Sequence, residues 1–255
     1  MLPIKRQKAP GEYAVVVSFH LKKDTLWASK GYEVAFGEGI YKVEEKETTI
    51  KGAFCIVDGT NNFGVRGENF EVLFDRGGRG IVSYKYMGRE FINSQVRPNF
   101  WRAPIDNDRG NGLPARSGQW KLASQYAKIS GFECNYTKKE AVLTYKYELP
   151  TMPAATATLT YTVTPDGAVK VALDYKCIEG LPEIPEFGVI MKVPADYDKL
   201  TWYGYGPEET YSDRTKGAKL GLYANKVADN MAGYIKPQEC GNHTGVRWAS
   251  VTDQS

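Results

Sequence analysis

Two stretches of the sequence concentrate side chains that can bind or position a polar ligand. The first runs from Asn99 to Gly112 and reads NFWRAPIDNDRGNG, an aromatic anchor followed by short acids and amides and then by glycines. Asp and Asn side chains hydrogen-bond nearby backbone groups, so the pattern predicts a structured loop. Carboxylates and amides also bind hydroxyl groups, but Asx residues dominate turns generally, so the loop is favoured over a sugar site. The candidate contact residues are Arg102, Asp106, Asn107, Asp108, Gly110 and Gly112.

The second stretch runs from Trp202 to Arg214 and reads WYGYGPEETYSDR. Aromatic faces beside acids and an arginine suit a carbohydrate, whose C–H faces stack on rings while its hydroxyls take hydrogen bonds. The competing interpretation is a strand end whose aromatic residues belong to the core and whose acid and arginine hold a turn. The residues alone leave both interpretations open. The candidates are Trp202, Tyr203, Glu208, Tyr211, Asp213 and Arg214.

Self-sufficient catalytic machinery is missing from the sequence. A histidine-based metal site usually needs three or four ligands at workable spacing, and the two histidines, His20 and His243, lie far apart. No serine or cysteine nucleophile motif accompanies either histidine. The segment from Arg76 to Gly80 lacks the ending of a phosphate-binding loop, so we expect a turn between strands. The four cysteines form no CxxC pair, which predicts free and mostly buried thiols.

The composition favours strands and a soluble chain. Aromatic residues make up 13% of the 255 residues and recur among Val and Thr, which suit half-buried strands. Lys and Arg exceed Asp and Glu by only 33 to 30 and the signs are interspersed, which argues against a nucleic-acid partner. No apolar run approaches the ~20 residues of a membrane span, and the N-terminus lacks a signal-peptide core. An export signal could still precede a fragment.

The first 67 residues are predicted to form part of a small sandwich, followed by a segment that connects it to the rest of the chain. Tyr13 to Phe19 and Gly31 to Phe36 are predicted strands, separated by a polar turn. The stretch from Glu38 to Gly67 is polar and dotted with glycine, which is typical of a connection. We place a domain boundary near residue 60.

Beyond that boundary, the spacing of apolar residues predicts several half-buried strands. The alternation is clearest in the stretches 70–75, 81–86, 143–149, 157–163 and 169–175. Thr164 to Gly167 forms a turn between the last two, because Pro165 fixes φ and Gly167 tolerates a positive φ. One helix is predicted, from Gln119 to Lys128, with Trp120, Ala123 and Ala127 on one side.

Three long motifs carry a family resemblance. They are NFWRAPIDNDRGNG, LPEIPEFGVIMKVPADYDKLTWYGYGPEETYSDR, and QECGNHTGVRW at Gln238 to Trp248. In order and spacing they resemble the C-terminal domain of the β-galactosidases of glycoside hydrolase family 2, over residues 66 to 255. Gly11 to Glu38 also resembles the closing strands of the immunoglobulin-like domain that precedes it.

The resemblance implies an all-β fold. It implies a galactose-mutarotase-like antiparallel supersandwich over residues 61–255, truncated at its C-terminus, and part of an immunoglobulin-like β-sandwich with a linker over residues 1–60. In that family, paired glutamates on a TIM barrel that uses Mg and Na hydrolyse terminal β-D-galactosides such as lactose with retention. Retention needs two carboxylates about 5 Å apart, and Glu208 and Glu209, as neighbours on a strand, would point to opposite faces. The barrel is absent here, so we assign no catalytic residue, metal ligand or cofactor to this chain.

The resemblance also implies a role for the first stretch. Asp106 to Gly112 corresponds to a loop near the mouth of the active site, in which we expect Gly110 and Gly112 to permit movement while Arg102 and Asp106 anchor the base. The expected partners are the catalytic barrel and remaining domains of a bacterial β-galactosidase, cytoplasmic or periplasmic, with a galactoside bound only in the assembled enzyme; oligomerisation is left open. The alternatives are a stand-alone carbohydrate-binding module using Trp202, Tyr203 and Tyr205, and a mutarotase-like domain that relies on His243.

Overall fold

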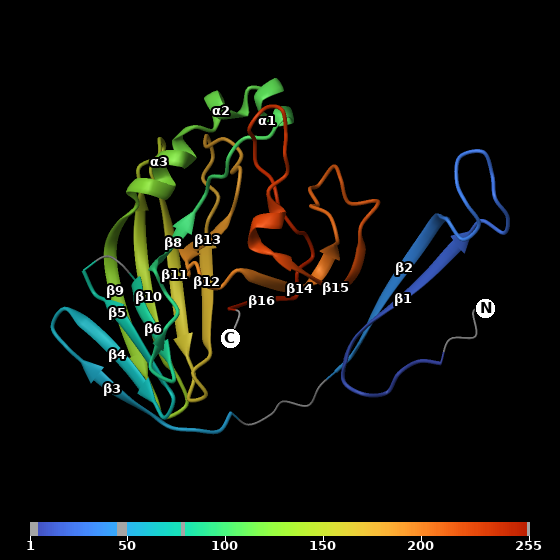
Figure 1. The fold of residues 1–255 in the computed structure, drawn as a ribbon. Coiled ribbons are helices and arrows are strands. Elements are labelled where there is room, and N and C mark those ends of the chain that lie inside the picture. Colours follow the sequence, from blue (N-terminus) through green and yellow to red (C-terminus); the bar gives the residue numbers. More distant parts are fainter. Residues whose placement is uncertain (1–4, 45–49, 78–79, 254–255) are drawn as a thin grey trace. The chain divides into compact units, whose positions relative to one another are not determined.

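The chain folds into β-sheets that form two compact units. A computed structural model describes residues 5–44, 50–77 and 80–253 (Figure 1). Unit 1 comprises residues 1–49, 201–224 and 242–250, and unit 2 comprises residues 50–200, 225–241 and 251–255. The predominance of strands over short helices confirms the all-β prediction. Unit 1 contains segments from both sides of residue 60. The two units are therefore not the two predicted domains, and the boundary near residue 60 stays a prediction.

Unit 2 contains two large antiparallel sheets and a smaller one. The first has the order β3-β4-β5-β6-β7, the second β12-β11-β10-β9, and the third pairs β13 with β8. The strands of the first sheet are β3 (Phe54–Asp58), β4 (Asn62–Gly67), β5 (Phe70–Asp75), β6 (Gly80–Tyr86) and β7 (Arg89–Glu90). The others are β8 (Ser94–Asn99), β9 (Lys128–Tyr136), β10 (Ala141–Leu149), β11 (Ala155–Val163), β12 (Val169–Tyr175) and β13 (Gly188–Lys192).

The core of unit 2 lies where the two large sheets meet. Alternate residues of β5, β10 and β11 are buried, as the period of two predicted, because neighbours on a strand face opposite sides. The rings of Phe74 and Tyr161 meet edge to face at 5.3 Å. The Tyr145 hydroxyl donates to the Asp75 carbonyl at 3.0 Å, and the Tyr161 hydroxyl donates to the Val96 carbonyl at 3.2 Å. These buried hydroxyls therefore tie strands of different sheets together.

The turn between β11 and β12 confirms the predicted hairpin. Val163 lies opposite Val169 in an antiparallel pair, and Gly167 has a φ of +87°. A Cβ atom at Gly167 would lie 2.8 Å from the Phe70 ring. Only glycine therefore satisfies both the backbone and the packing at this position.

The predicted connection between Glu38 and Gly67 is wrong in part, because it contains the end of β2, β3 and β4. Phe54 and Ile56 alternate within β3 and pack against the core, so a short strand forms despite the polar composition. The predicted turn from Arg76 to Gly80 lies between β5 and β6, although its residues 78–79 lie outside the described residues.

The helices lie between β8 and β9, apart from one 3-10 turn. The predicted helix is confirmed as α3 (Gln119–Tyr126), which buries Trp120 and Ala123. The prediction of no other helix is wrong: α1 (Asp106–Gly110), α2 (Leu113–Arg116) and the 3-10 helix η1 (Val227–Asn230) also form. Elements of four or five residues are too short to show a helical period. In the part of the chain that the structure describes, no helix is long and apolar enough to span a membrane.

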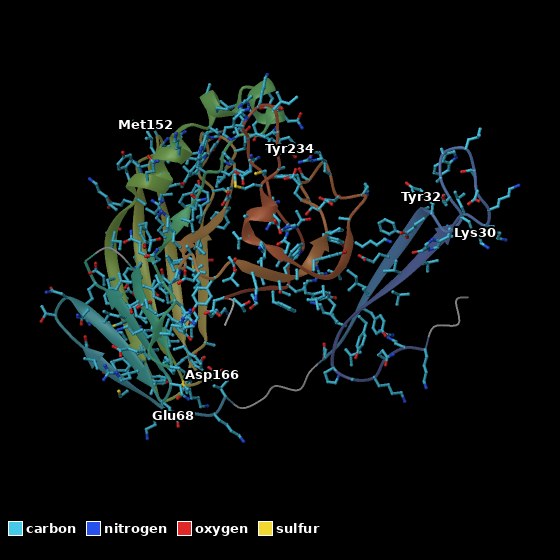
Figure 2. The ribbon with its side chains drawn as sticks, in the orientation of Figure 1. Lys30, Tyr32, Glu68, Met152, Asp166 and Tyr234 are labelled. Atoms are coloured by element: carbon cyan, nitrogen blue, oxygen red, sulfur yellow. The ribbon has the colours of Figure 1, made fainter. Side chains whose placement is uncertain are left out.

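Unit 1 combines a hairpin with three further strands. The hairpin pairs β1 (Gly11–His20) with β2 (Glu33–Val43), and the other strands are β14 (Lys199–Gly206), β15 (Lys219–Lys226) and β16 (Trp248–Thr252), in the order β15-β14-β16. No residue of β1 or β2 is buried. Lys30 and Tyr32 lie at the closed end of the hairpin (Figure 2). The buried side chains of this unit are Trp202, Thr210, Tyr211 and Leu220.

The cysteines differ from expectation in their burial. All four are free, as predicted, but Cys55 and Cys177 are exposed and Cys134 and Cys240 are half-buried. The prediction of mostly buried thiols is therefore wrong. For Cys55 and Cys134, which lie on β3 and β9, burial depends on whether their face of the sheet is covered, and spacing along the chain does not reveal this.

Candidate functional site

Asp108 is the buried centre of the first candidate segment. It is 6% exposed, and its Oδ2 atom accepts hydrogen bonds from Arg102 Nη1 at 2.6 Å and from the Ile105 backbone N–H at 2.9 Å. Burial acts to raise the pKa of Asp108, but the hydrogen bonds from Arg102 and Ile105 outweigh it, so the pKa lies below its ordinary value. Asp108 and Arg102 therefore form an ionised pair that fixes the start of α1.

Asp106 contacts Arg109 and Gln238. Its side chain is exposed, lies 3.3 Å from Arg109 Nη1, and accepts from Gln238 Nε2 at 3.1 Å. Its backbone N–H donates to Gln238 Oε1 at 3.2 Å. Arg102 is thus anchored by Asp108, whereas Asp106 connects α1 to the third sequence motif.

The first residues of that third motif contact the first candidate segment within unit 2. Besides Gln238, Glu239 accepts from the Ala103 backbone N–H at 3.2 Å, and the Pro237 carbonyl accepts from Arg109. The sequence analysis did not identify these partners as site residues. For Gln238 and Glu239, the position inside a motif of the family resemblance was the only signal that could have found them, and Pro237 lies just before that motif.

The two glycines of the segment differ in conformation. Gly110 ends α1, and nothing lies within 4 Å of a Cβ atom built there. Gly112 precedes α2 with a φ of +75°, a conformation that costs an L-residue about 1–2 kcal/mol. Asn107 is exposed on α1. Alanine would therefore fit at position 110 but be strained at position 112.

Trp202, the leading aromatic of the second candidate segment, is buried. It is 2% exposed, and its ring packs on His243 at 4.2 Å and on Tyr223 at 5.5 Å. Its Nε1 atom donates to the Tyr205 carbonyl at 3.2 Å. Burial lowers the pKa of His243, so this imidazole is neutral at pH 7. A sugar cannot stack on Trp202 in this arrangement, which favours the core interpretation.

The end of the second segment is a turn closed by Arg214. Its backbone N–H donates to the Tyr211 carbonyl at 2.9 Å, and its guanidinium lies 5.2 Å from the Tyr211 ring and 2.6 Å from Glu209 Oε1. Tyr211 is buried, at 7% exposure. Arg214 therefore holds a turn, with Glu209 as an acid partner, whereas the turn interpretation named Asp213 beside Arg214.

Glu208 and Glu209 lie after the end of β14, so the expectation that they are neighbours on a strand is wrong. Glu208 and Asp213 are exposed and line a hollow of about 350 Å³ with Glu209 and Arg214. Tyr203 is half-buried, and the Arg247 Cζ atom lies over its ring, 5.9 Å from the ring centroid. The hollow lined by Glu208 and Asp213 is therefore the part of the second segment that presents polar side chains at the surface.

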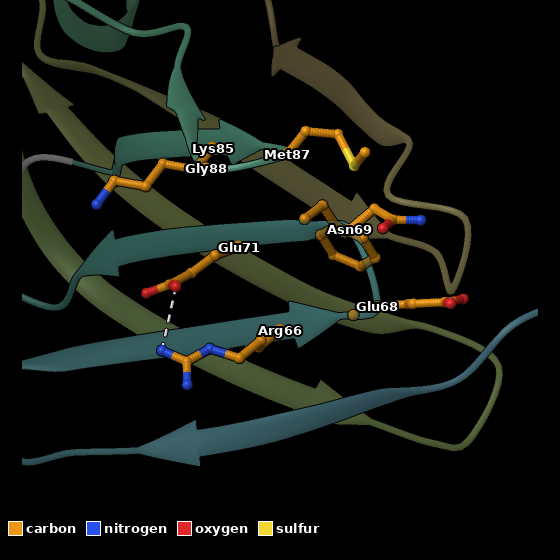
Figure 3. A pocket seen from close by; sticks show the side chains of 9 residues that line it. Arg66, Glu68, Asn69, Glu71, Lys85, Met87 and Gly88 are labelled. Carbon is orange, nitrogen blue, oxygen red and sulfur yellow. Dashed lines mark hydrogen bonds and ion pairs between the residues drawn. The ribbon is translucent and has the colours of Figure 1, made fainter.

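Another hollow of about 410 Å³ lies on unit 2 beside β4, β5 and β6 (Figure 3). Its charged residues include Arg66 and Glu71, whose side chains form an ion pair at 3.1 Å. None of the candidate residues from either segment lines it. We therefore do not assign it to the candidate site.

The two candidate segments lie in different units. The carboxylates of Asp106, Asp108 and Glu209 are each engaged by an arginine. Among the described residues, no group of three or more His, Cys, Asp or Glu side chains is placed to hold a metal ion.

Comparison with known proteins identifies relatives over nearly the whole chain. A family model described as beta galactosidase small chain matches residues 66–255, and one described as beta-galactosidase domain 4 matches residues 1–40. The β-galactosidase of Halalkalibacterium halodurans is 40% identical over 248 residues, which is 95% of this chain and 24% of the relative. That of Clostridium acetobutylicum is 40% identical over 87% of this chain and 25% of the relative.

A shorter relative is the β-galactosidase small subunit of Latilactobacillus sakei. It is 30% identical over 79% of this chain and 69% of the subunit. The chain thus spans about a quarter of the length of the first two relatives and most of this one. Since one family model covers residues 66–255 and the relatives agree with it, the chain belongs to the family of the β-galactosidase small chain.

Proposed function

We propose that this chain is a non-catalytic C-terminal part of a bacterial β-galactosidase, an enzyme that hydrolyses terminal non-reducing β-D-galactose residues of galactosides such as lactose. The observation that carries the proposal is how much of each relative the chain matches. It matches 24% of a β-galactosidase and 69% of a protein named as a small subunit. In this proposal the barrel of the parent enzyme supplies the paired glutamates and the Mg and Na ions. The chain contributes to assembly and to the mouth of the active site.

The first candidate segment is the part that we propose shapes the active-site mouth. The buried Arg102–Asp108 pair and the Gln238 contacts hold α1 in place, while Asp106 and Asn107 remain exposed on it. Gly110 and Gly112 flank the connection to α2. This combination provides a polar surface on a fixed base with permissive backbone at its edge.

Reconstitution of the enzyme from two parts tests the proposal. One part is this chain, and the other is the H. halodurans β-galactosidase without the quarter that the chain matches. We expect the two parts together to hydrolyse an aryl β-galactoside. We expect neither part to do so alone. A fusion of the two parts in one polypeptide controls for weak assembly. Hydrolysis by the chain alone, or a folded but inactive fusion, would contradict the proposal.

The alternative functions give opposite results with the isolated chain. Titration calorimetry with galactose and lactose should show no binding, whereas a carbohydrate-binding module would bind. Proton NMR should show an unchanged rate of anomer interconversion, whereas a mutarotase would accelerate it. Either positive result would replace the proposed function.

The role of the first segment is tested by Gly110→Ala in the active fusion. Alanine fits at this position and favours helix over glycine by about 1 kcal/mol, so it should restrict the segment without unfolding it. We expect kcat or KM for lactose to change. Gly37→Ala, an equally open position on β2, is the matched control. Unchanged kcat and KM in Gly110→Ala would remove the segment from the active-site mouth.

A further inference from the structure

A basic hollow lies over β6, β8 and β13 of unit 2. Its volume is about 420 Å³, and it is lined by Val82, Ser94, Gln95, Arg97 and Lys192. Arg97 and Lys192 supply two positive charges, Ser94 and Gln95 add a hydroxyl and an amide, and no lining residue is acidic. Charged donors beside neutral ones are the groups that recognise a carboxylate.

The two cations converge because of the strand register. Ser94 pairs with Lys192 and Arg97 pairs with Ile190 across the antiparallel β8–β13 ladder, whose register shifts between Ile190 and Lys192. Residues directly opposite each other share a face of a sheet, and with this shift Arg97 and Lys192 both line the hollow. In the described ranges of the chain, neither cation forms a salt bridge; Arg97 reaches only the Ser124 carbonyl, at 3.5 Å. A guanidinium has five N–H donors, so most of the hydrogen-bonding capacity of Arg97 is still available.

The strand β13 beside this hollow is exposed and apolar. Four of its five residues are exposed, including Val189 at 41%, Ile190 at 42% and Met191 at 56%. Among the described strands it pairs only with β8, so its other edge presents unpaired N–H and C=O groups. A free, apolar strand edge favours pairing with another chain segment.

We infer that the face formed by β8 and β13 is the surface on which an acidic segment of the remaining β-galactosidase docks. An Asp or Glu carboxylate would lie between Arg97 and Lys192, and an apolar side chain would cover Ile190, which lies opposite Arg97. The inference rests on the proposed function, since the other three quarters of the relatives' length supply the segment. A small free anion would fill the hollow but leave β13 exposed, so a polypeptide fits the observations better.

Charge reversal at the hollow tests the inference. The variant is Arg97→Glu with Lys192→Glu, and the control is Lys128→Glu with Lys170→Glu, which makes the same change in net charge at exposed positions of β9 and β12. The measurement is the Kd between the chain and the remainder of the H. halodurans enzyme, by sedimentation at low and high salt. We expect the variant to bind about 100-fold more weakly and to lose most of the salt dependence, while the control binds like the unaltered chain.

Thermal unfolding of each isolated chain shows whether the substitutions disturb the fold. If the double reversal unfolds early, Arg97→Gln with Lys192→Gln replaces it, with an expected weakening of about 10-fold. Equal Kd values for the variant, the control and the unaltered chain would overturn the inference and leave the proposed function standing. If the unaltered chain does not bind the remainder at all, the inference is overturned, and the activity of the fusion alone decides the proposed function.

Discussion

The sandwich of unit 2 and the β1–β2 hairpin of unit 1 are both antiparallel and both contain strands along which exposure alternates, yet only the sandwich has a core. Tyr145, Leu159 and Tyr161 are fully buried in unit 2, whereas no residue of the hairpin is buried. An isolated two-stranded hairpin is marginally stable at best in water. Alternation thus indicates which side chains can face a core, but the covering layer must come from elsewhere. For residues 1–40, which match domain 4 of β-galactosidase, we propose that the parent enzyme supplies it.

Ion pairs give the largest expected contrast between the two regions. Arg102→Ala would leave the buried Asp108 carboxylate without its charged partner and should lower the free energy of unfolding by about 3 kcal/mol. The hairpin pair between Lys42 and Glu12 lies at 3.6 Å with the lysine side chain 75% exposed, so Lys42→Ala should cost less than about 0.5 kcal/mol. Urea unfolding measures both. Equal losses would contradict the comparison.

The same pair makes the stability of unit 2 sensitive to acid. The pKa of Asp108 is lowered on folding, so its stabilising contribution is complete above the ordinary aspartate pKa of about 3.9. It is lost as the pH falls through the lower, folded pKa. The unfolding free energies of the unaltered chain and Asp108→Asn should therefore converge below about pH 4. A difference that stays constant from pH 7 to pH 3 would show that Asp108 is not an ionised anchor.

The same substitution, valine to alanine, compares side-chain packing in the sandwich and in the hairpin. Val163 is fully buried in β11, and Val163→Ala should cost about 2 kcal/mol through lost apolar contacts and a cavity. Val17 lies half-buried in β1, and Val17→Ala should cost less than about 0.5 kcal/mol in the isolated chain. A larger loss at Val17 would mean that the hairpin already has a core.

Removal of a tyrosine hydroxyl gives the smallest contrast. Tyr145→Phe deletes the buried hydrogen bond to the Asp75 carbonyl and should cost about 1 kcal/mol. Tyr13→Phe deletes an exposed hydrogen bond to the Ala9 carbonyl, where water replaces the partner, so the unfolding free energy should stay the same. The midpoints of thermal unfolding distinguish these outcomes.

The sequence predicted the regular strands well, because a period of two survives in 70–75, 143–149 and 157–163 whatever covers them. It missed α1 and α2, whose four or five residues carry no period. It also could not choose between core and sugar site for Trp202. That choice depends on His243 and Tyr223, which contact the ring from distant parts of the chain.

The partners of the first candidate segment show the same limit. The sequence predicted a structured loop from its short acids, whereas these residues form the short helices α1 and α2. It named Arg102 and Asp106 as anchors of the base but did not identify Asp108 as the partner of Arg102. Only the helical turn places Asp108 inward, at 6% exposure, and only the fold brings Gln238 to Asp106.

Hydrogen exchange tests the central claim, that this chain is an accessory part completed by the rest of a β-galactosidase. Amides of β10 and β11 should be protected in the isolated chain and in the complex with the H. halodurans remainder. Amides of β1 and β2 should exchange rapidly in the isolated chain and become protected only in the complex, as the missing layer is supplied. Equal protection of the hairpin and the sandwich in the isolated chain, unchanged on adding the remainder, would contradict the account.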